Sequence, residues 1–120
     1  MGEITVGEFR QKIINRLYLE KFRHKNEFNY EELIRETMFI SNRISKENKL
    51  EDVWARLCGR RLFLFYRPTN RIVCEIGIDG TNVLLVNLKG LVPDSLTMNT
   101  IIARTKELGA RKKKGLHGRR

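Results

Sequence analysis

Apolar side chains recur at helical spacing over the first half of the chain. Thr5 and Glu8 have the form of a capping box, in which the two side chains satisfy the backbone N–H groups at a helix start. Apolar residues then follow every four positions, at Phe9, Ile13 and Leu17. The spacing predicts an amphipathic helix from Thr5 to about His24.

Two more helices are predicted before residue 60. Asn29 with Glu32 repeats the capping signal and opens a second helix through Ile44, and the polar residues 45–48 are expected to end it. Asn48 with Glu51 then predicts a short third helix, Lys49–Cys58, with Gly59 as its C′ residue. The apolar positions of this helix are expected to face the core, at Leu50, Val53, Trp54 and Leu57.

From Arg61 the period of apolar residues changes to two. The alternation predicts strands at Leu62–Tyr66, Arg71–Ile78 and Thr81–Leu88. Asp79-Gly80 has the composition of a two-residue type I′ hairpin turn, which would pair Ile78 with Thr81. Residues 89–93 are expected to form a loop.

A last helix is predicted from Asp94 or Ser95 up to Gly109. The fold class is therefore α+β, with three N-terminal helices, a three-stranded antiparallel meander, a C-terminal helix and a basic tail. At 120 residues the chain is long enough for one hydrophobic core. We expect residues 1–109 to form one domain and residues 110–120 a flexible tail.

The predicted hairpin assigns side chains to two sheet faces. The core face would carry mainly aliphatic residues, namely Leu62, Leu64, Tyr66, Ile72, Cys74, Ile76, Ile78, Val83 and Leu85. The opposite face would carry Arg61, Phe63, Phe65, Arg67, Arg71, Val73, Glu75, Leu84 and Val86. Aromatic rings beside arginines on an open sheet are typical of a platform for single-stranded nucleic acid. The alternative is that the N-terminal helices cover this face, and Leu84 and Val86 favour that alternative.

The net charge of the chain favours a polyanionic partner. Lys and Arg number 24 against 14 acidic residues, so the formal net charge is +10. Residues 110–120 contain no acid and six basic residues: Arg111, Lys112, Lys113, Lys114, Arg119 and Arg120. A basic run of this kind favours phosphate neutralisation, although a solubilising or nuclear-targeting tail has the same composition.

Residue types that carry catalysis are not grouped along the chain. Neither His24 nor His117 has a local Cys, Asp or Glu at metal-ligand spacing, so we expect no metal, no cofactor and no enzymatic activity. A small metal-dependent nuclease that recruits Glu75, Asp79 and Lys89 from neighbouring strands stays an alternative.

The expected setting is a reducing one. Two cysteines, Cys58 and Cys74, do not make a disulfide framework. The acidic N-terminus lacks an apolar segment of signal-peptide length, and no apolar run reaches membrane-spanning length. We expect an intracellular, cytoplasmic protein, or a nuclear one if the source is eukaryotic, with no membrane partner.

The order helix–strand–strand–strand–helix from residue 49 onward resembles that of double-stranded RNA-binding domains. That family opens its last helix with a lysine-rich segment, whereas here residues 91–96 read Leu-Val-Pro-Asp-Ser-Leu. The resemblance therefore extends to element order only, and no family is assigned.

These patterns predict a non-enzymatic nucleic-acid-binding protein with phosphate contacts that are largely independent of sequence. RNA and DNA both stay open as the partner. The second hypothesis is a structural or interaction subunit of a larger assembly, such as a ribonucleoprotein, a virion or a polymerase-associated complex.

Overall fold

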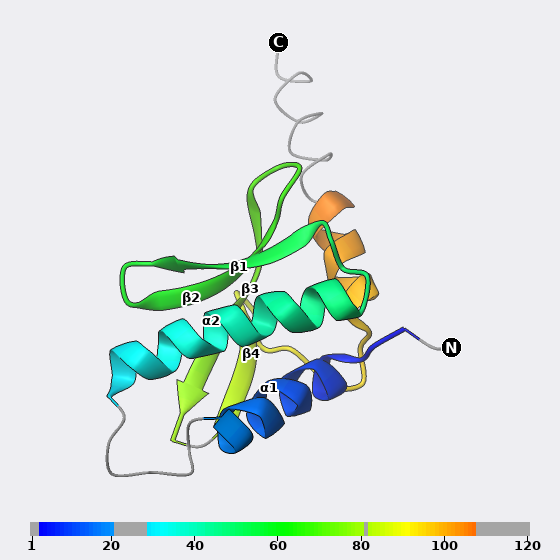
Figure 1. Ribbon diagram of the computed structural model, residues 1–120. Coiled ribbons are helices and arrows are strands. Elements are labelled where there is room, and N and C mark those ends of the chain that lie inside the picture. The colour runs from blue at the N-terminus through cyan, green and yellow to red at the C-terminus, as the bar shows by residue number, and fades with distance from the viewer. Residues whose placement is uncertain (1–2, 21–28, 81, 108–120) are drawn as a thin grey trace.

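The structure is a computed structural model that describes residues 3–20, 29–80 and 82–107. Helices α1 (Val6–Glu20) and α2 (Tyr30–Glu47) precede five strands, and a C-terminal helix is described over residues 98–107. The strands form one antiparallel sheet in chain order: β1 (Val53–Cys58), β2 (Arg61–Tyr66), β3 (Arg71–Asp79), β4 (Asn82–Asn87) and β5 (Gly90–Leu91) (Figure 1). The expected α+β class is consistent with this arrangement, but the expected three N-terminal helices and three-stranded meander are wrong.

The predicted third helix, Lys49–Cys58, is strand β1 and the turn before it. Asn48 is the C-cap of α2, and Lys49 adopts a left-handed conformation with φ of 58°. The N–H of Lys49 donates to Lys46 O and that of Leu50 to Ser45 O, which is the Schellman pattern that ends a helix. The chain therefore leaves α2 extended, and the predicted N-cap at Asn48 is in fact a helix end.

The capping predictions for the first two helices are confirmed. Thr5 N–H donates to the Glu8 carboxylate at 2.8 Å, and Glu8 N–H donates to Thr5 Oγ1 at 3.0 Å. The Asn29 side chain accepts from Glu32 N–H, as an N-cap does. The C-terminal helix, in contrast, begins at residue 98 and not at 94 or 95, with the Thr97 hydroxyl accepting from Thr100 N–H.

The β3–β4 hairpin differs from its predicted register by two residues. Asp79 pairs with Asn82 and Ile78 pairs with Val83, so the pairing closes at Asp79 and Asn82 and not at Ile78 and Thr81. Gly80 takes φ of 62°, a left-handed conformation that glycine adopts at little cost. Because side chains alternate with a period of two, this shift leaves each residue on its predicted face.

A β-bulge in β3 changes the faces at one end of the sheet. Leu64 pairs with Cys74, but the next residue along β2, Phe65, pairs with Ile72. The extra residue turns Ile72 away from the core, and its side chain is 52% exposed. The prediction that Ile72 is a core residue is therefore wrong.

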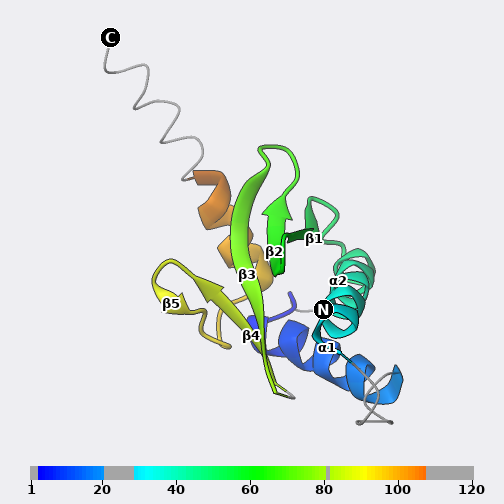
Figure 2. The ribbon, with the colours of Figure 1, turned by 90° about the vertical axis from the view of Figure 1, so that its left-hand side faces the viewer.

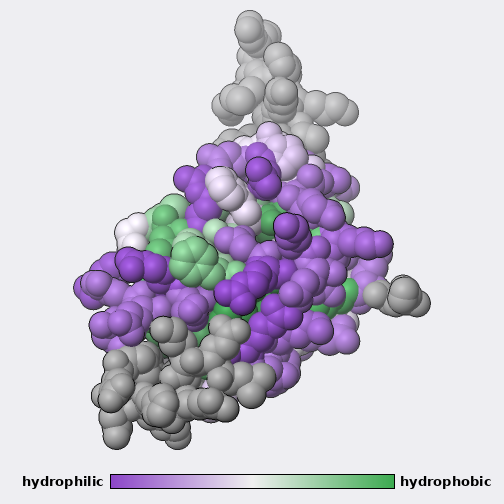
Figure 3. Space-filling view, viewed as in Figure 1, coloured by the Kyte–Doolittle hydropathy of each residue, from purple (hydrophilic) through white to green (hydrophobic). Residues whose placement is uncertain are grey.

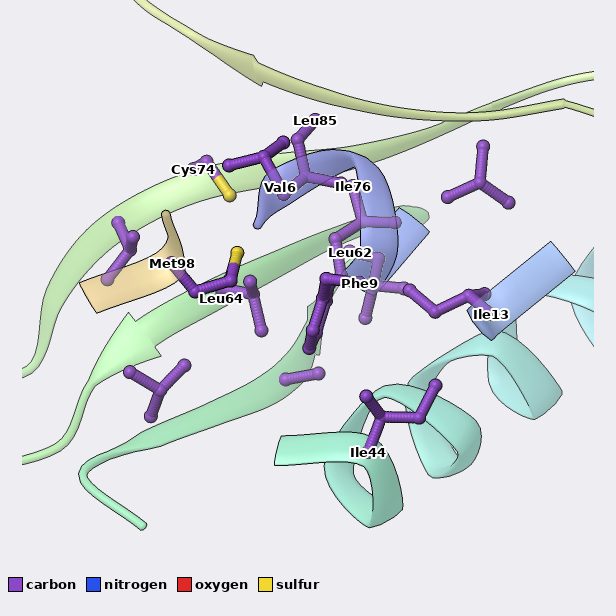
Figure 4. Packing of buried hydrophobic residues seen from close by; sticks show 14 of the residues in the cluster. Val6, Phe9, Ile13, Ile44, Leu62, Leu64, Cys74, Ile76, Leu85 and Met98 are labelled. Atoms are coloured by element: carbon purple, nitrogen blue, oxygen red, sulfur yellow. The ribbon is translucent and has the colours of Figure 1, made fainter. Parts of the chain in front are cut away.

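All three described helices lie on one face of the sheet, called here the inner face. Side chains from α1, from α2 and from the C-terminal helix converge on the inner residues of β2, β3 and β4, among them Leu64, Cys74 and Leu85 (Figure 4). In Figure 2, α1 and α2 lie beside the strands and the C-terminal helix lies behind them. The molecule thus has two layers, and one side of its sheet faces away from the helices.

Both long edges of the sheet are occupied by helix side chains. On β1, Asn42 of α2 accepts from Ala55 N–H at 2.7 Å and donates to Ala55 O at 3.1 Å. On β4, Arg10 of α1 donates to Val83 O at 3.4 Å and to the Asn82 side chain at 3.0 Å. Since these side chains take the place of a neighbouring strand, strand addition at these positions is blocked.

Arg10 also ties α1 to the segment before the C-terminal helix. Its guanidinium binds both carboxylate oxygens of Asp94, with the shorter contact at 2.9 Å. Asp94 O accepts from Gly7 N–H, and a Cβ on Gly7 would lie 3.0 Å from Asp94 Cβ. Glycine at position 7 therefore lets the start of α1 approach this segment closely.

Three further expectations concern a membrane-spanning helix, the resemblance to double-stranded RNA-binding domains and the tail. Among the described residues, no helix has both the length and the apolar character that crossing a bilayer requires. Five strands, not three, separate α2 from the C-terminal helix, so the element order of double-stranded RNA-binding domains is not reproduced. The expected tail, residues 110–120, lies outside the described residues.

Candidate nucleic-acid interface

The side of the sheet that faces away from the helices is called here the outer face. Strand alternation and pairing assign to it Trp54, Arg56 and Cys58 of β1, Arg61, Phe63 and Phe65 of β2, Ile72, Val73 and Glu75 of β3, Leu84 and Val86 of β4, and Leu91 of β5. Arg67 extends this set just beyond β2. Seen from the side of α1 and α2, the surface is largely hydrophilic, with an apolar patch above α2 over β1 and β2 (Figure 3). The outer face itself combines aromatic, aliphatic and cationic side chains.

Three rings and three guanidinium groups on β1 and β2 form one contiguous group. We call it the aromatic–arginine cluster: Trp54, Arg56, Arg61, Phe63, Phe65 and Arg67. The rings of Phe63 and Phe65 meet edge to face, with centroids 6.1 Å apart. The Arg61 guanidinium carbon lies 5.1 Å from the Phe63 centroid, which is within cation–π range.

Trp54 is flanked by two of the arginines. The guanidinium carbon of Arg56 lies 4.9 Å from the indole centroid, and that of Arg67 lies 5.1 Å from it. Arg56 is also 5.1 Å from the Phe65 centroid, so one guanidinium contacts two rings. Trp54 stays 37% exposed, which leaves part of the indole open to solvent.

The cluster is held in place by the strand pairing and by the β2–β3 turn. Trp54 pairs directly with Phe65, and Arg56 pairs directly with Phe63. Arg56 also donates to the Asn70 side chain at 3.1 Å, and Asn70 adopts a left-handed φ of 56° in that turn. These contacts fix the position of the Arg56 head group at the rim of the sheet.

Arg61 differs from the other two arginines because it is paired with an acid. Its Nε and Nη2 donate to the two carboxylate oxygens of Glu75, at 3.0 and 2.7 Å. These hydrogen bonds lower the pKa of Glu75 below its usual value, and they raise the pKa of Arg61. Among the described residues, Arg56 and Arg67 thus supply the positive charge of the cluster that no acid neutralises through a bidentate pair.

None of the described helices covers the outer face. The prediction that the N-terminal helices cover this face is wrong, because α1 and α2 pack on the inner face. Phe65 and Val73 are nevertheless buried, at 7% and 8% exposure. Trp54 pairs with Phe65 from the neighbouring strand and the Arg56 guanidinium lies 5.1 Å from the Phe65 ring, whereas Val73, the extra residue of the bulge, belongs to the buried hydrophobic cluster.

The structure brings together four of the predicted site residues, Arg61, Phe63, Phe65 and Arg67. Arg71 lies apart from them, because the bulge pairs it with Tyr66, whose side chain is buried on the inner side. The other predicted site residues, Arg111, Lys112, Lys113, Lys114, Arg119 and Arg120, lie outside the described residues.

Trp54 and Arg56 are site residues that the sequence pattern did not reveal. Both lie in the segment assigned to a helix, and Trp54 was expected in the core. The overlooked signal is the alternation of Val53, Ala55 and Leu57 with polar or large neighbours, which is a strand period. Gly59 supports the strand assignment, because it is the first residue of the two-residue loop of the β1–β2 hairpin and adopts a left-handed φ of 66° there.

The side chains of the alternative nuclease site do not converge on a metal position. Both oxygens of Glu75 accept from Arg61, and Asp79 ends β3 four residues further on. Among the described residues, no three His, Cys, Asp or Glu side chains group as metal ligands. Cys74 is buried, and desolvation raises the pKa of its thiol to about 12.

No protein-family model, no curated protein and no solved structure matches this chain. The geometry of the outer face is therefore the basis for assigning a function.

Proposed function

We propose that this chain is a non-enzymatic nucleic-acid-binding protein and that the outer face of its sheet is the binding surface. One observation carries the proposal: the aromatic–arginine cluster lies on a sheet face that no described helix covers. The rings offer stacking surfaces, and the guanidinium groups offer bidentate donors to phosphate.

The charge of the chain supports a polyanionic partner. The formal net charge is +10, and Arg56 and Arg67 add local positive charge beside the exposed part of Trp54. A positive surface attracts a polyanion over distances of a Debye length, about 8–10 Å at moderate salt. Contacts of this type hold phosphates without reading bases, so affinity should depend only weakly on sequence.

The basic segment 110–120 is proposed to add affinity. Its six Lys and Arg residues could each neutralise one phosphate and release one counterion. A chain that ends at Gly109 should therefore bind more weakly and with a flatter salt dependence. The outer face should still supply the base contacts.

Fluorescence anisotropy with labelled RNA and DNA tests the proposal. The double variant Arg56→Gln and Arg67→Gln should lower the affinity and flatten the slope of log K against log salt by about 1.4 for a single strand, since each phosphate contact contributes about 0.7. The matched control is Arg35→Gln with Arg104→Gln, which removes the same charge from exposed helix positions. Equal effects of the two double variants would show that net charge, and not the outer face, governs binding.

A second candidate function is that of an interaction subunit in a larger assembly. The observation that favours it is the β4–β5 hairpin, where Leu88 is fully exposed and Leu91 is 66% exposed. Exposed apolar side chains of this kind can anchor a protein partner. A size-exclusion profile that shifts with a partner protein, but not with RNA or DNA, would favour this function.

We also propose an intracellular, reducing setting. Cys58 is exposed and free, and Cys74 is buried and free. An exposed thiol persists more readily where glutathione keeps cysteines reduced.

A further inference from the structure

We infer that the outer face takes single-stranded nucleic acid, with bases stacked on Trp54 and Phe63. This inference rests on the proposed function and names the class of ligand. In the binding step, a base replaces a guanidinium group at the Trp54 ring. The displaced arginine then turns to the phosphate of the same strand.

The width of the sheet argues against a duplex as the partner of the rings. Five strands span about 19 Å, because neighbouring strands lie about 4.8 Å apart. The major groove of B-DNA is about 12 Å wide and admits a helix or a two-stranded ribbon. The sheet face therefore meets only the backbone of a duplex, whose base faces are already stacked on one another.

Ring access distinguishes the residues that can stack. Phe65 is 7% exposed and is covered by Arg56, so its ring serves as a support. Trp54 is 37% exposed, and Phe63 is partly exposed and lies diagonal to it on the neighbouring strand, because Trp54 pairs with Phe65 and Arg56 pairs with Phe63. Two accessible rings on neighbouring strands suit a nucleic-acid strand whose bases are turned toward the sheet.

The exchange of guanidinium for base is favourable on general grounds. An exposed cation–π contact is generally weaker than the stacking of a base on an aromatic ring. The freed guanidinium gains a phosphate in place of the ring. Arg67 is the exchanging residue, because both oxygens of Glu75 hold Arg61 and the hydrogen bond to the Asn70 side chain holds Arg56.

The aliphatic side chains of β4 and β5 extend the surface. Leu84 and Val86 are partly exposed on the outer face, and Leu91 pairs with Val86. These aliphatic side chains can contact further bases, but they carry no charge that would bind further phosphates. A strand that begins at Trp54 can therefore continue over β3 and β4.

Trp54 is the one tryptophan of the chain, so its fluorescence reports on this site directly. Three probes of equal length and backbone chemistry are titrated: a 12-mer single strand, the same 12-mer as a duplex, and a 12-mer abasic single strand. We expect the single strand to quench Trp54 and to bind more tightly than the abasic strand by about 5- to 150-fold for each stacked base. The abasic strand should bind weakly and leave the fluorescence unchanged.

The outcomes separate the inference from the proposed function. Equal affinities for the single strand, the duplex and the abasic strand would overturn the inference and leave nucleic-acid binding in place. Binding of none of the three would overturn both. Trp54→Leu, followed with a labelled 12-mer, should reduce the preference for bases over the abasic strand by the share of one stacked base, about 5- to 150-fold, whereas Phe39→Leu on the exposed side of α2 should leave the preference unchanged.

Discussion

Asn42 is predicted to be one of the residues on which the stability of β1 depends. Its side-chain amide satisfies both peptide groups of Ala55, at 2.7 and 3.1 Å, on the open edge of the sheet. Ala55 is 2% exposed, so water has little access to these groups. The change Asn42→Ala removes both hydrogen bonds and leaves a buried donor and a buried acceptor without partners.

The expected cost follows from these two lost contacts. A hydrogen bond contributes about 0.5–1.5 kcal/mol net, and a buried group left unpaired costs about 1–3 kcal/mol. Because Asn42 is itself only partly buried, we expect partial hydration and a total loss of about 2–4 kcal/mol. Small domains have about 5–15 kcal/mol of stability, so the effect is a large share of the total.

Urea unfolding followed by circular dichroism measures this loss. The Asn42→Ala midpoint should fall by about 0.7–4 M, given a slope of about 1–3 kcal/mol per M. Arg35→Ala, at an exposed position of the same helix, should change the unfolding free energy by less than about 0.5 kcal/mol. An Asn42→Ala variant as stable as Arg35→Ala would refute the role of this amide at the β1 edge.

Three further predictions concern the edge of β4, the outer face and the cysteines. Arg10→Met should lower the unfolding free energy by about 2–3 kcal/mol, because it removes the hydrogen bonds to β4 and the ion pair that anchors α1; a thermal melt like that of the parent chain would contradict this. The Arg61 hydrogen bonds lower the pKa of Glu75, so its carboxylate stabilises the fold above the ordinary pKa of 4.5, and this stability is lost as the pH falls through the lower folded value. Glu75→Gln should therefore lose less stability than the parent chain on acidification below pH 4.5, and identical pH profiles would count against the pair. An aromatic disulfide reagent at pH 8 should modify exposed Cys58 in the native protein and reach Cys74, with its pKa of about 12, only after denaturation.

Local signals in the sequence predicted much of the helical and strand content. The capping residues Thr5 and Asn29 mark real helix starts, because a side chain close in sequence satisfies the backbone there. The alternation from Leu62 to Leu85 assigned most inner residues correctly, since a register error of two preserves the face.

The errors arise where the chain geometry depends on tertiary contacts. Residues 49–58 carry helical as well as strand spacing, and the left-handed Lys49 with β2 as a partner decides between them. That error removed Trp54 and Arg56 from the predicted site. The alternation of apolar residues does not indicate the bulge opposite Phe65. The sequence therefore could not predict that Ile72 lies on the outer face and Arg71 on the side of Tyr66.

The most direct test of the proposed interface is ultraviolet cross-linking of the full chain to RNA and to DNA, followed by mass spectrometry of the cross-linked peptides. Aromatic residues in contact with bases cross-link efficiently at zero length. Cross-links are expected at Trp54 and Phe63, within the segment that runs from β1 through β2. Cross-links confined to α1, α2 or the hairpin around Leu88, with none on β1 or β2, would contradict the assignment of the outer face as the nucleic-acid-binding surface.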